Sequence, residues 1–162
     1  MLETKRLRLE PWEPDDRLQF APLATDAEMM RYISGGRPWT PEEIQLFADK
    51  QRIRFAEGGY CRWKLTLKSG GPMIGFCGMG LLDSFEAPEI GWWVAREHWG
   101  HGLASEAAAE ALRDARERLK IPRLVSVAHK DNAASIRVMQ KIGLRFGRAA
   151  EFRGYPVVVY TL

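Results

Sequence analysis

The sequence predicts a mixed α/β (α+β) domain built around one twisted sheet of about seven strands, with helices on its faces. Apolar residues follow the two-residue period of strands in some segments and the 3.6-residue period of helices in others, and turns rich in glycine and proline separate these segments. The chain has 162 residues, 46% of them hydrophobic, which suffices for one core. We therefore expect a single domain over residues 1–162.

The first part of the chain changes from a strand pattern to helical patterns. Leu7 and Leu9 alternate with charged residues, as in a half-buried strand. Between residues 14 and 59 the apolar period lengthens, and Thr40-Pro41-Glu42-Glu43 supplies an N-cap, a proline in the first turn and early acids. We expect helices in this region, interrupted by a loop around Ser34-Gly35-Gly36.

Three strand-like runs follow, at residues 60–67, 73–82 and 87–94. The segment Lys68-Ser69-Gly70-Gly71-Pro72 lies between the first two runs and is typical of a turn in an antiparallel hairpin. These runs predict the central part of the sheet.

The last part of the chain alternates helices and strands. Residues 103–119 are the clearest helix, because alanines and leucines form one apolar stripe. Residues 124–128 are almost continuously apolar, which is typical of a strand covered on both faces, and they complete a parallel strand-helix-strand unit. A second helix over residues 132–141 and two strands over 144–152 and 155–161 finish the pattern.

Composition and charge exclude several classes of function. The formal net charge is +3, but acidic and basic residues are interleaved, as in residues 113–118, so nucleic-acid binding is not indicated. Cys61 and Cys77 lie in apolar strand-like runs without the spacing of metal ligands, which predicts buried free thiols. The first nine residues lack the apolar core of a signal peptide, and no apolar run is long enough to span a membrane. We expect a cytoplasmic protein.

The segment of residues 97–106, between a strand and the long helix, carries the clearest chemical signal. Gly100 and Gly102 let backbone amides approach a ligand closely, and the first turn of the helix presents unpaired N–H groups, an arrangement that holds pyrophosphate. A lone Gly-x-Gly also serves as a simple tight connection. A Walker A loop is excluded by its missing lysine, and a dinucleotide fingerprint by the missing acid about 20 residues further on.

Residues 99–104, Trp-Gly-His-Gly-Leu-Ala, resemble the acyl-CoA motif of the GNAT superfamily of N-acyltransferases, with Trp99 in place of the usual Gln or Arg. An aromatic residue there is similar to the RimJ/RimL-like branch of that superfamily. Three further segments resemble the branch and occur in its order, at residues 3–9, 89–93 and 132–144. The resemblance covers nearly the whole chain and is weakest between residues 12 and 59.

The resemblance implies a GNAT-like fold, in which a mixed, mostly antiparallel sheet has a splayed central strand pair that takes acetyl-CoA. It implies transfer of an acetyl group to a primary amine, of a peptide N-terminus or a small molecule, by direct attack in a ternary complex. The implied cofactor-binding residues are Trp93, Val94, Trp99, Gly100, His101, Gly102, Leu103, Ala104, Ser105, Asn132 and Ser135. With three histidines in the chain, no metal site is expected.

The attack of an amine on a thioester needs a stabilised oxyanion and a proton source for the thiolate. Backbone N–H groups near Val94 and Ala95 are expected to serve the oxyanion. Many family members place a tyrosine acid seven residues after the helix-starting asparagine, and this chain has Met139 there. Ser135 falls on the inward face of the same helix, where it either contacts the thiol or pantetheine or packs closely and bonds the preceding turn.

Two other polar residues also have two readings each. Glu89 lies on a strand before the glycine turn and is a candidate catalytic base, acting directly or through water, or else a salt-bridged strand acid. Asn132 caps its own helix, bonds the cofactor arm, or does both. The expected acceptor pocket, whose aromatic residues otherwise belong to the core, comprises Arg31, Tyr32, Trp39, Trp63 and the hairpin at residues 153–155.

Two rival hypotheses remain beside the transferase. The first is a non-catalytic acyl-CoA-binding module on the same scaffold, supported by the missing tyrosine; it would bind CoA and transfer nothing. The second is a nucleotide-binding regulator, in which NAD or ATP would displace acyl-CoA. The sequence names neither the amine nor the oligomeric state, and a homodimer through edge strands is one option.

Overall fold

The computed structural model describes residues 1–82, 85 and 87–162, and the described strands form one eight-stranded sheet in the order β1-β2-β3-β4-β5-β6-β8-β7. The strands are β1 (Leu2–Glu3), β2 (Leu7–Glu10), β3 (Arg62–Leu67), β4 (Gly75–Gly80), β5 (Glu89–Val94), β6 (Val125–His129), β7 (Arg145–Phe152) and β8 (Tyr155–Thr161). The helices are α1 (Asp16–Thr25), α2 (Ala27–Ser34), α3 (Pro41–Gly58), α4 (Leu103–Glu117) and α5 (Ala133–Lys141). The mixed α/β class is confirmed.

The seven predicted strands are all present, and β1 is the addition. Its two residues, Leu2 and Glu3, pair with Leu9 and Arg8 of β2. Two residues are too short a run to show a two-residue period, which is why the pattern did not reveal β1.

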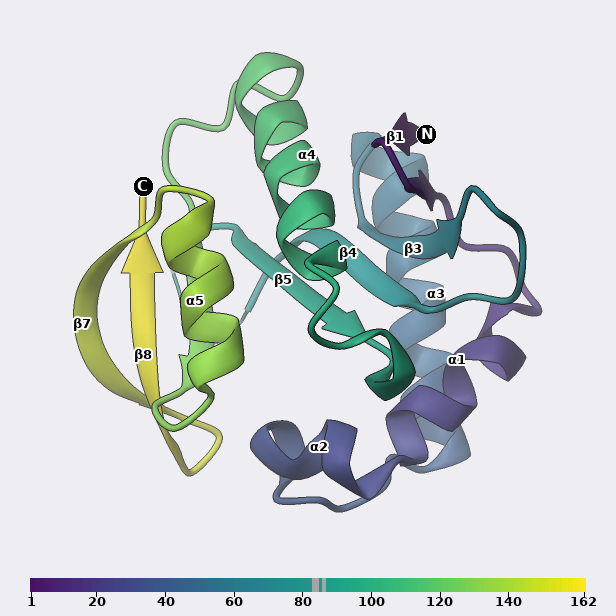
Figure 1. The fold of residues 1–162 in the computed structure, drawn as a ribbon, viewed down its shortest axis with the longest axis horizontal. Helices are drawn as coiled ribbons and strands as arrows, with labels where there is room; N and C mark the ends of the chain where they lie inside the picture. The colour runs from purple at the N-terminus through teal and green to yellow at the C-terminus, as the bar shows by residue number, and fades with distance from the viewer. Residues whose placement is uncertain (83–84, 86) are drawn as a thin grey trace.

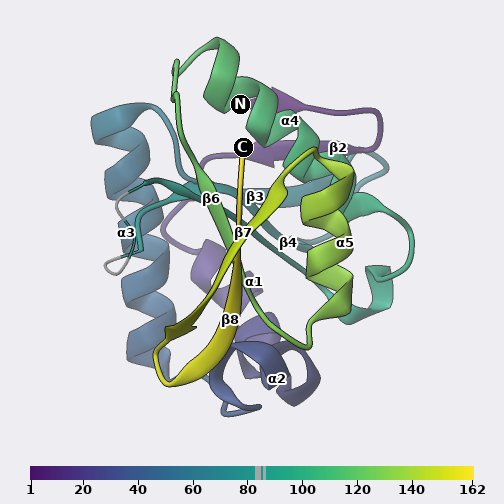
Figure 2. The ribbon, with the colours of Figure 1, turned by 90° about the vertical axis from the view of Figure 1, so that its left-hand side faces the viewer.

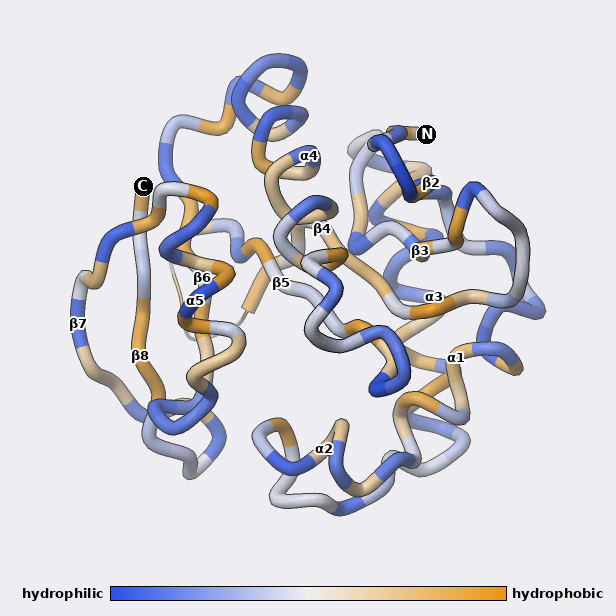
Figure 3. Tube along the Cα trace, viewed as in Figure 1, coloured by the Kyte–Doolittle hydropathy of each residue, from blue (hydrophilic) through white to orange (hydrophobic). Residues whose placement is uncertain are grey.

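Helices cover both faces of the sheet. Helices α4 and α5 lie on one side, and α1 and α3 lie on the other, with α2 near one end of β6 and β8 (Figures 1 and 2). Hydrophobic residues gather along the strands at the centre of the sheet, whereas the last turns of α4 are hydrophilic (Figure 3). A core cluster of buried apolar side chains therefore continues from one helical layer to the other through the sheet.

The centre of the sheet contains its one parallel strand pair in the described chain, β5 with β6. These strands meet at Glu89 and Val125, where the Val125 N–H donates to the Pro88 carbonyl over 3.0 Å, and then they diverge. At the start of the gap the Ser126 hydroxyl donates to the Ile90 carbonyl over 2.9 Å. A splayed central pair, as the resemblance implied, is thus present.

Helix α3 begins as the sequence predicts. The Thr40 hydroxyl accepts from the Glu43 N–H, and the Glu43 carboxylate accepts from the Thr40 N–H, which is a capping box. Further along, the buried Gln51 accepts a hydrogen bond from the Arg62 N–H over 3.1 Å. Helix α3 is therefore hydrogen-bonded to β3 and packs against one face of the sheet.

An aromatic cluster fills the space between the sheet and helices α1 and α3. The Trp93 ring lies 5.0 Å from Phe76 and 5.6 Å from Phe20, measured between ring centroids. Cys61 and Cys77 are buried free thiols, as predicted, and burial raises the pKa of Cys61 to about 12 and also raises that of Cys77. Because the thiolate is the reactive form, neither thiol is set up for chemistry at neutral pH.

One prediction about β6 is wrong. Ser126 and Ala128 are buried, but Val125, Val127 and His129 on the opposite face are partly exposed. The second face is thus only partly covered, and its residues Val127 and His129 line the cleft described below. Within the described chain, no helix is both long and apolar enough to cross a membrane.

Candidate active site

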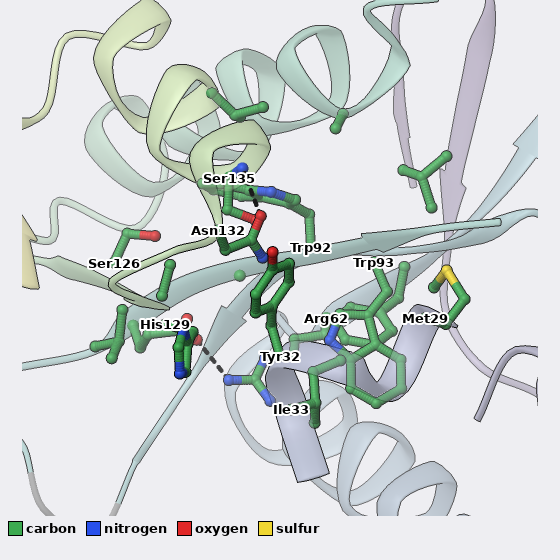
Figure 4. A pocket seen from close by; sticks show the side chains of 18 of the residues that line it. Met29, Tyr32, Ile33, Arg62, Trp92, Trp93, Ser126, His129, Asn132 and Ser135 are labelled. Atoms are coloured by element: carbon green, nitrogen blue, oxygen red, sulfur yellow. Dashed lines mark hydrogen bonds and ion pairs between the residues drawn. The ribbon is translucent and has the colours of Figure 1, made fainter. Parts of the chain in front are cut away.

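A cleft of about 1470 Å³ has walls from both faces of the sheet and includes the gap between β5 and β6. On one side it is bounded by the start of α4 and by α5, and on the other by α2, α3 and the β7–β8 hairpin. Figure 4 shows side chains from these elements pointing into it. A cleft that passes between two strands can hold a long ligand with one end on each face of the sheet.

The glycine turn forms one end of this cleft. Gly100 and Gly102 have φ angles of +78° and +76°, in the left-handed region that favours glycine. Gly102 is the N-cap of α4, and its carbonyl accepts the first helical bond, from Glu106 N–H. The amides of Leu103, Ala104 and Ser105 therefore have no intrahelical acceptor, and all three residues line the cleft.

These free amides make the turn an anion cradle. A Cβ at Gly100 would meet nothing within 4 Å, so the backbone is bare where a ligand would approach. The start of a helix also carries partial positive charge. His101 is the exception among the predicted cofactor residues of the turn, because its exposed side chain does not line the cleft.

Trp99 has a clear structural role. Its indole Nε1–H donates to the Val94 carbonyl over 2.6 Å, and the residue also lines the cleft. The aromatic residue in place of the usual Gln or Arg thus ties the glycine turn to the end of β5, which fixes the cradle relative to the strand gap.

The backbone at the end of β5 bears on the two N–H groups that were predicted to stabilise the oxyanion, those of Val94 and Ala95. The Ala95 N–H donates to the Ile74 carbonyl over 2.7 Å, so it is not free to stabilise an oxyanion. Because hydrogen-bond direction alternates along a strand, the Val94 N–H faces the opposite way, toward the gap with β6. The Trp93 side chain packs in the aromatic cluster, which leaves the backbone of β5 as the part able to serve a ligand.

Asn132 and Ser135 lie together at the start of α5. The Asn132 side-chain oxygen accepts from the Ser135 N–H over 3.1 Å, so the predicted N-cap is present. Both residues are partly exposed and line the cleft, and the Tyr32 ring of α2 approaches this corner from the other side (Figure 4). In the described chain the Ser135 hydroxyl has no protein partner, so the alternative of a bond to the preceding turn is not observed.

Glu89 forms an ion pair with Arg62, with 2.5 Å between Oε2 and Nη2. Their side chains are only 6% and 15% exposed. Two glycines make room for the pair: a Cβ at Gly91 would lie 2.8 Å from the Glu89 carboxylate, and one at Gly80 would lie 3.0 Å from the Arg62 guanidinium. The salt-bridged reading of Glu89 is therefore observed, and the residue also lines the cleft.

Aromatic rings line the opposite part of the cleft. Tyr32 lies 5.3 Å from the His129 ring and Tyr155 lies 6.3 Å from it, which joins α2, β6 and β8. Trp39 also lines the cleft, with its ring 5.0 Å from Trp93. Tyr32 and Trp39, both predicted for the acceptor pocket, thus line the same cleft, Tyr32 beside His129 and Trp39 beside Trp93.

Trp63, which was predicted to belong to the acceptor pocket, is not among the residues that line the cleft. Its side chain is 2% exposed and packs edge-on against Phe55, with 5.3 Å between centroids. Side chains alternate across a strand, so Trp63 points to the core while its neighbour Arg62 points to the cleft. Sequence reasoning missed Arg62, Ser126 and His129; the strand alternation that buries Trp63 was the available signal for Arg62.

Among the described residues no group of three His, Cys, Asp or Glu side chains is placed to hold a metal ion.

Two charged residues, Arg6 and Glu106, lie beside the glycine turn and belong to one hydrogen-bond network. Glu106 accepts hydrogen bonds from Thr4 and from Arg6. Burial raises the pKa of Glu106, but these hydrogen bonds outweigh burial and leave the pKa lowered. Their stabilising contribution is therefore present at neutral pH and is lost as the pH falls through that lowered value.

The comparisons with known proteins agree with this geometry. The family described as Acetyltransferase (GNAT) domain matches residues 6–145. The uncharacterized protein YkkB of Bacillus subtilis is 29% identical, over 98% of this chain and 93% of its own length. The FsC-acetyl coenzyme A-N(2)-transacetylase of Aspergillus fumigatus is 30% identical, over 88% of this chain and 64% of its own length.

Solved structures show the same fold. An acetyltransferase from Agrobacterium tumefaciens superposes with a TM-score of 0.87 at 25% identity, covering 99% of this chain and 92% of that one. The ribosomal L7/L12 α-N-protein acetyltransferase RimL, solved with coenzyme A, superposes with a TM-score of 0.81 at 18% identity, covering 98% and 94%. The second likeness concerns the fold alone.

Proposed function

The chain belongs to the acetyltransferase (GNAT) family and is an acyl-CoA-dependent acetyltransferase, and from this premise we propose that it transfers the acetyl group of acetyl-CoA to a primary amine in a ternary complex. The amine is that of a peptide N-terminus or of a small molecule. One observation carries the proposal. A single cleft joins an anion cradle, a strand edge with a free amide, and a pocket of aromatic and charged side chains on the other face of the sheet.

The residues present fit acetyl-CoA. The bare backbone at Gly100 and the unpaired amides of residues 103–105 suit its pyrophosphate. The Val94 N–H, which faces the strand gap, suits the pantetheine arm or the thioester carbonyl. Asn132 and Ser135 flank the same gap from α5. Acetyl-CoA, when bound, supplies an activated acyl group and a thiolate leaving group.

The proposed reaction is direct acyl transfer. The amine nitrogen forms a bond to the thioester carbonyl carbon, and the C–S bond then breaks to release CoA as a thiol. Backbone N–H groups stabilise the oxyanion. Glu89 takes one proton from the attacking amine through water, and the Ser135 hydroxyl donates a hydrogen bond to the departing thiolate, which takes one proton from water. The acceptor enters from the side of Tyr32, Trp39 and the β7–β8 hairpin.

Ser135→Ala tests the role of the hydroxyl. We expect kcat to fall about 10- to 100-fold, the value of one hydrogen bond to a charge developing in the transition state. The Kd of acetyl-CoA should change little. Steady-state kinetics and calorimetry measure the two quantities, with Ser69→Ala in the exposed β3–β4 turn as control. Equal losses in kcat and in affinity would instead assign Ser135 to positioning the cofactor.

Glu89→Gln tests the proposed base while keeping the shape of the side chain. We expect kcat to fall about 10-fold, less than the roughly 10²-fold typical of a general base, because water can still carry the proton. Loss of the carboxylate also leaves the Arg62 charge unpaired, so thermal stability must be measured on the same sample. A lower melting temperature with kcat per folded molecule unchanged would show that Glu89 is structural only.

The alternative to the transferase is an acyl-CoA-binding module on the same fold. The absence of a tyrosine at the position of Met139, whose side chain is 1% exposed, supports that alternative. Release of CoA thiol from acetyl-CoA, followed against a panel of peptide N-termini, amino acids, polyamines and aminoglycosides, separates the two. Thiol release that depends on one amine supports the transferase. Tight binding of acetyl-CoA with no thiol release from any amine supports the module.

Three finer assignments belong to this proposal. The RimJ/RimL-like branch is supported by the aromatic Trp99 and by the fold likeness to RimL. A cytoplasmic location is supported by the two reduced, buried cysteines. The assignment of residues 1–162 to one domain is supported by the sheet, because strands near both ends of the chain belong to it. Pairing of two copies through an edge strand stays a prediction.

A further inference from the structure

We propose that Arg6 and Glu106 are positioning residues that hold the glycine turn in the orientation needed for the pyrophosphate of acetyl-CoA. The inference rests on the proposed function, and it assigns a role to the N-terminal segment, which lies outside the cleft. Neither residue lines the cleft, so each acts through the backbone of the turn.

The two residues form a dense contact beside the turn. Glu106 Oε1 accepts from the Thr4 hydroxyl over 2.5 Å and from the Arg6 N–H over 2.8 Å, and Oε2 accepts from Arg6 Nε over 2.7 Å. Arg6 Nη2 lies 2.7 Å from the same Oε2. One carboxylate oxygen, Oε2, thus faces both Nε and Nη2 of the guanidinium, while Oε1 accepts from Thr4 and from the Arg6 backbone, and these charge-assisted contacts are stronger than neutral hydrogen bonds. The segment before β2 is thereby fastened to the first turn of α4.

The guanidinium also contacts the glycine turn itself. Arg6 Nη1 donates to the His101 carbonyl over 3.0 Å, and that carbonyl belongs to the peptide between His101 and Gly102. In a trans peptide the C=O and N–H groups point in opposite directions. Holding the His101 oxygen on the side of Arg6 therefore turns the Gly102 N–H away from Arg6, toward the cleft that Gly102 lines.

Charge gives a second reason for the pairing. Glu106 lies in the first turn of α4, where a carboxylate stabilises the helix but opposes a bound phosphate nearby. Arg6 offsets this negative charge without occupying the cradle. The Arg6 Nη2 atom would lie 3.8 Å from a Cβ at Gly102, so the guanidinium stands directly behind the turn.

The test compares two acetyl donors that differ in their phosphates. For Arg6→Ala we expect the Kd of acetyl-CoA to rise about 10-fold, the loss of one charge-assisted hydrogen bond. The Kd of acetyl-pantetheine, which lacks the pyrophosphate, should not change. Calorimetry measures the first and NMR titration the second. Arg8→Ala is the matched control, because Arg8 lies two residues further along, in β2, and its ion pair with Glu3, at 3.9 Å, is exposed.

Three results would overturn the inference. If the Arg6→Ala variant binds acetyl-CoA as tightly as the wild type, Arg6 has no positioning role. If the Kd values of acetyl-CoA and of acetyl-pantetheine rise equally, the substitution causes a general loss of structure. Arg6→Lys, which keeps the charge but lacks the planar fork, should stay weakened, and full recovery would show that charge alone matters. Failure of the wild type itself to bind acetyl-CoA would instead refute the proposed function.

Discussion

Gly102→Asp is expected to weaken the binding of acetyl-CoA at least about 1000-fold, because like charges held close together cost several kcal/mol. The new carboxylate would stand at the N-terminus of α4, next to the amides proposed to bind the pyrophosphate, and it would also compete for Arg6, whose Nη2 lies 3.8 Å from a Cβ at this position. The φ angle of +76° adds backbone strain for any residue with a side chain. Calorimetric titration of the folded variant with acetyl-CoA measures the effect.

The control for this variant must carry the same strain and charge outside the cleft. Gly70→Asp serves, because Gly70 lies in the exposed β3–β4 turn with φ at +94° and nothing within 4 Å of its Cβ position. We expect Gly70→Asp to bind acetyl-CoA like the wild type. If Gly102→Asp also bound it with unchanged affinity, the glycine turn would be a structural connection and the cofactor assignment would be wrong.

Gly75→Ala is expected to lower the free energy of unfolding by about 4 kcal/mol, near the upper end for single substitutions. A Cβ at Gly75 would lie 2.0 Å from the Trp93 carbonyl oxygen and 2.9 Å from its carbon, and both are backbone atoms of the neighbouring strand. Its φ of +150° is also unfavourable for alanine. Strands β4 and β5 would have to separate where Val94 borders the cleft. Urea denaturation measures the loss.

Gly80→Ala is the control on the same strand. Its Cβ would lie 3.0 Å from the Arg62 guanidinium, which is the far end of a flexible side chain and can shift. We expect a loss of about 1 kcal/mol, the average for a point substitution. Equal stability of the two variants would contradict the register in which Gly75 pairs with Val94.

Most of the fold could be predicted from the sequence, because local patterns specify it. The alternation around Leu7 and Leu9 and the capping residues Thr40 and Glu43 reappear as β2 and as the start of α3. The covering of β6 was predicted wrongly. An apolar run such as residues 124–128 shows that a strand is apolar, and it does not show that a splayed neighbour leaves one face open.

The site was harder to predict, because its chemistry depends on partners distant in sequence. The glycine turn could be located because all its elements are contiguous. The ion pair of Glu89 with Arg62 joins strands 27 positions apart. The bond from Ala95 to Ile74 depends on strand register, which no local pattern reports. Trp63 was misassigned because aromatic composition alone does not say which side of a strand faces the cleft.

The central claim is that this cleft binds acetyl-CoA, and calorimetric titration of the purified chain tests it most directly. Acetyl-CoA, NAD and ATP are titrated separately into the same preparation. The account predicts micromolar binding of acetyl-CoA, with no comparable binding of NAD or ATP, because the turn lacks the lysine of an ATP-binding loop and the chain lacks the acid that an NAD site carries about 20 residues after its glycines. Absence of acetyl-CoA binding, or tighter binding of NAD or ATP, would contradict the account.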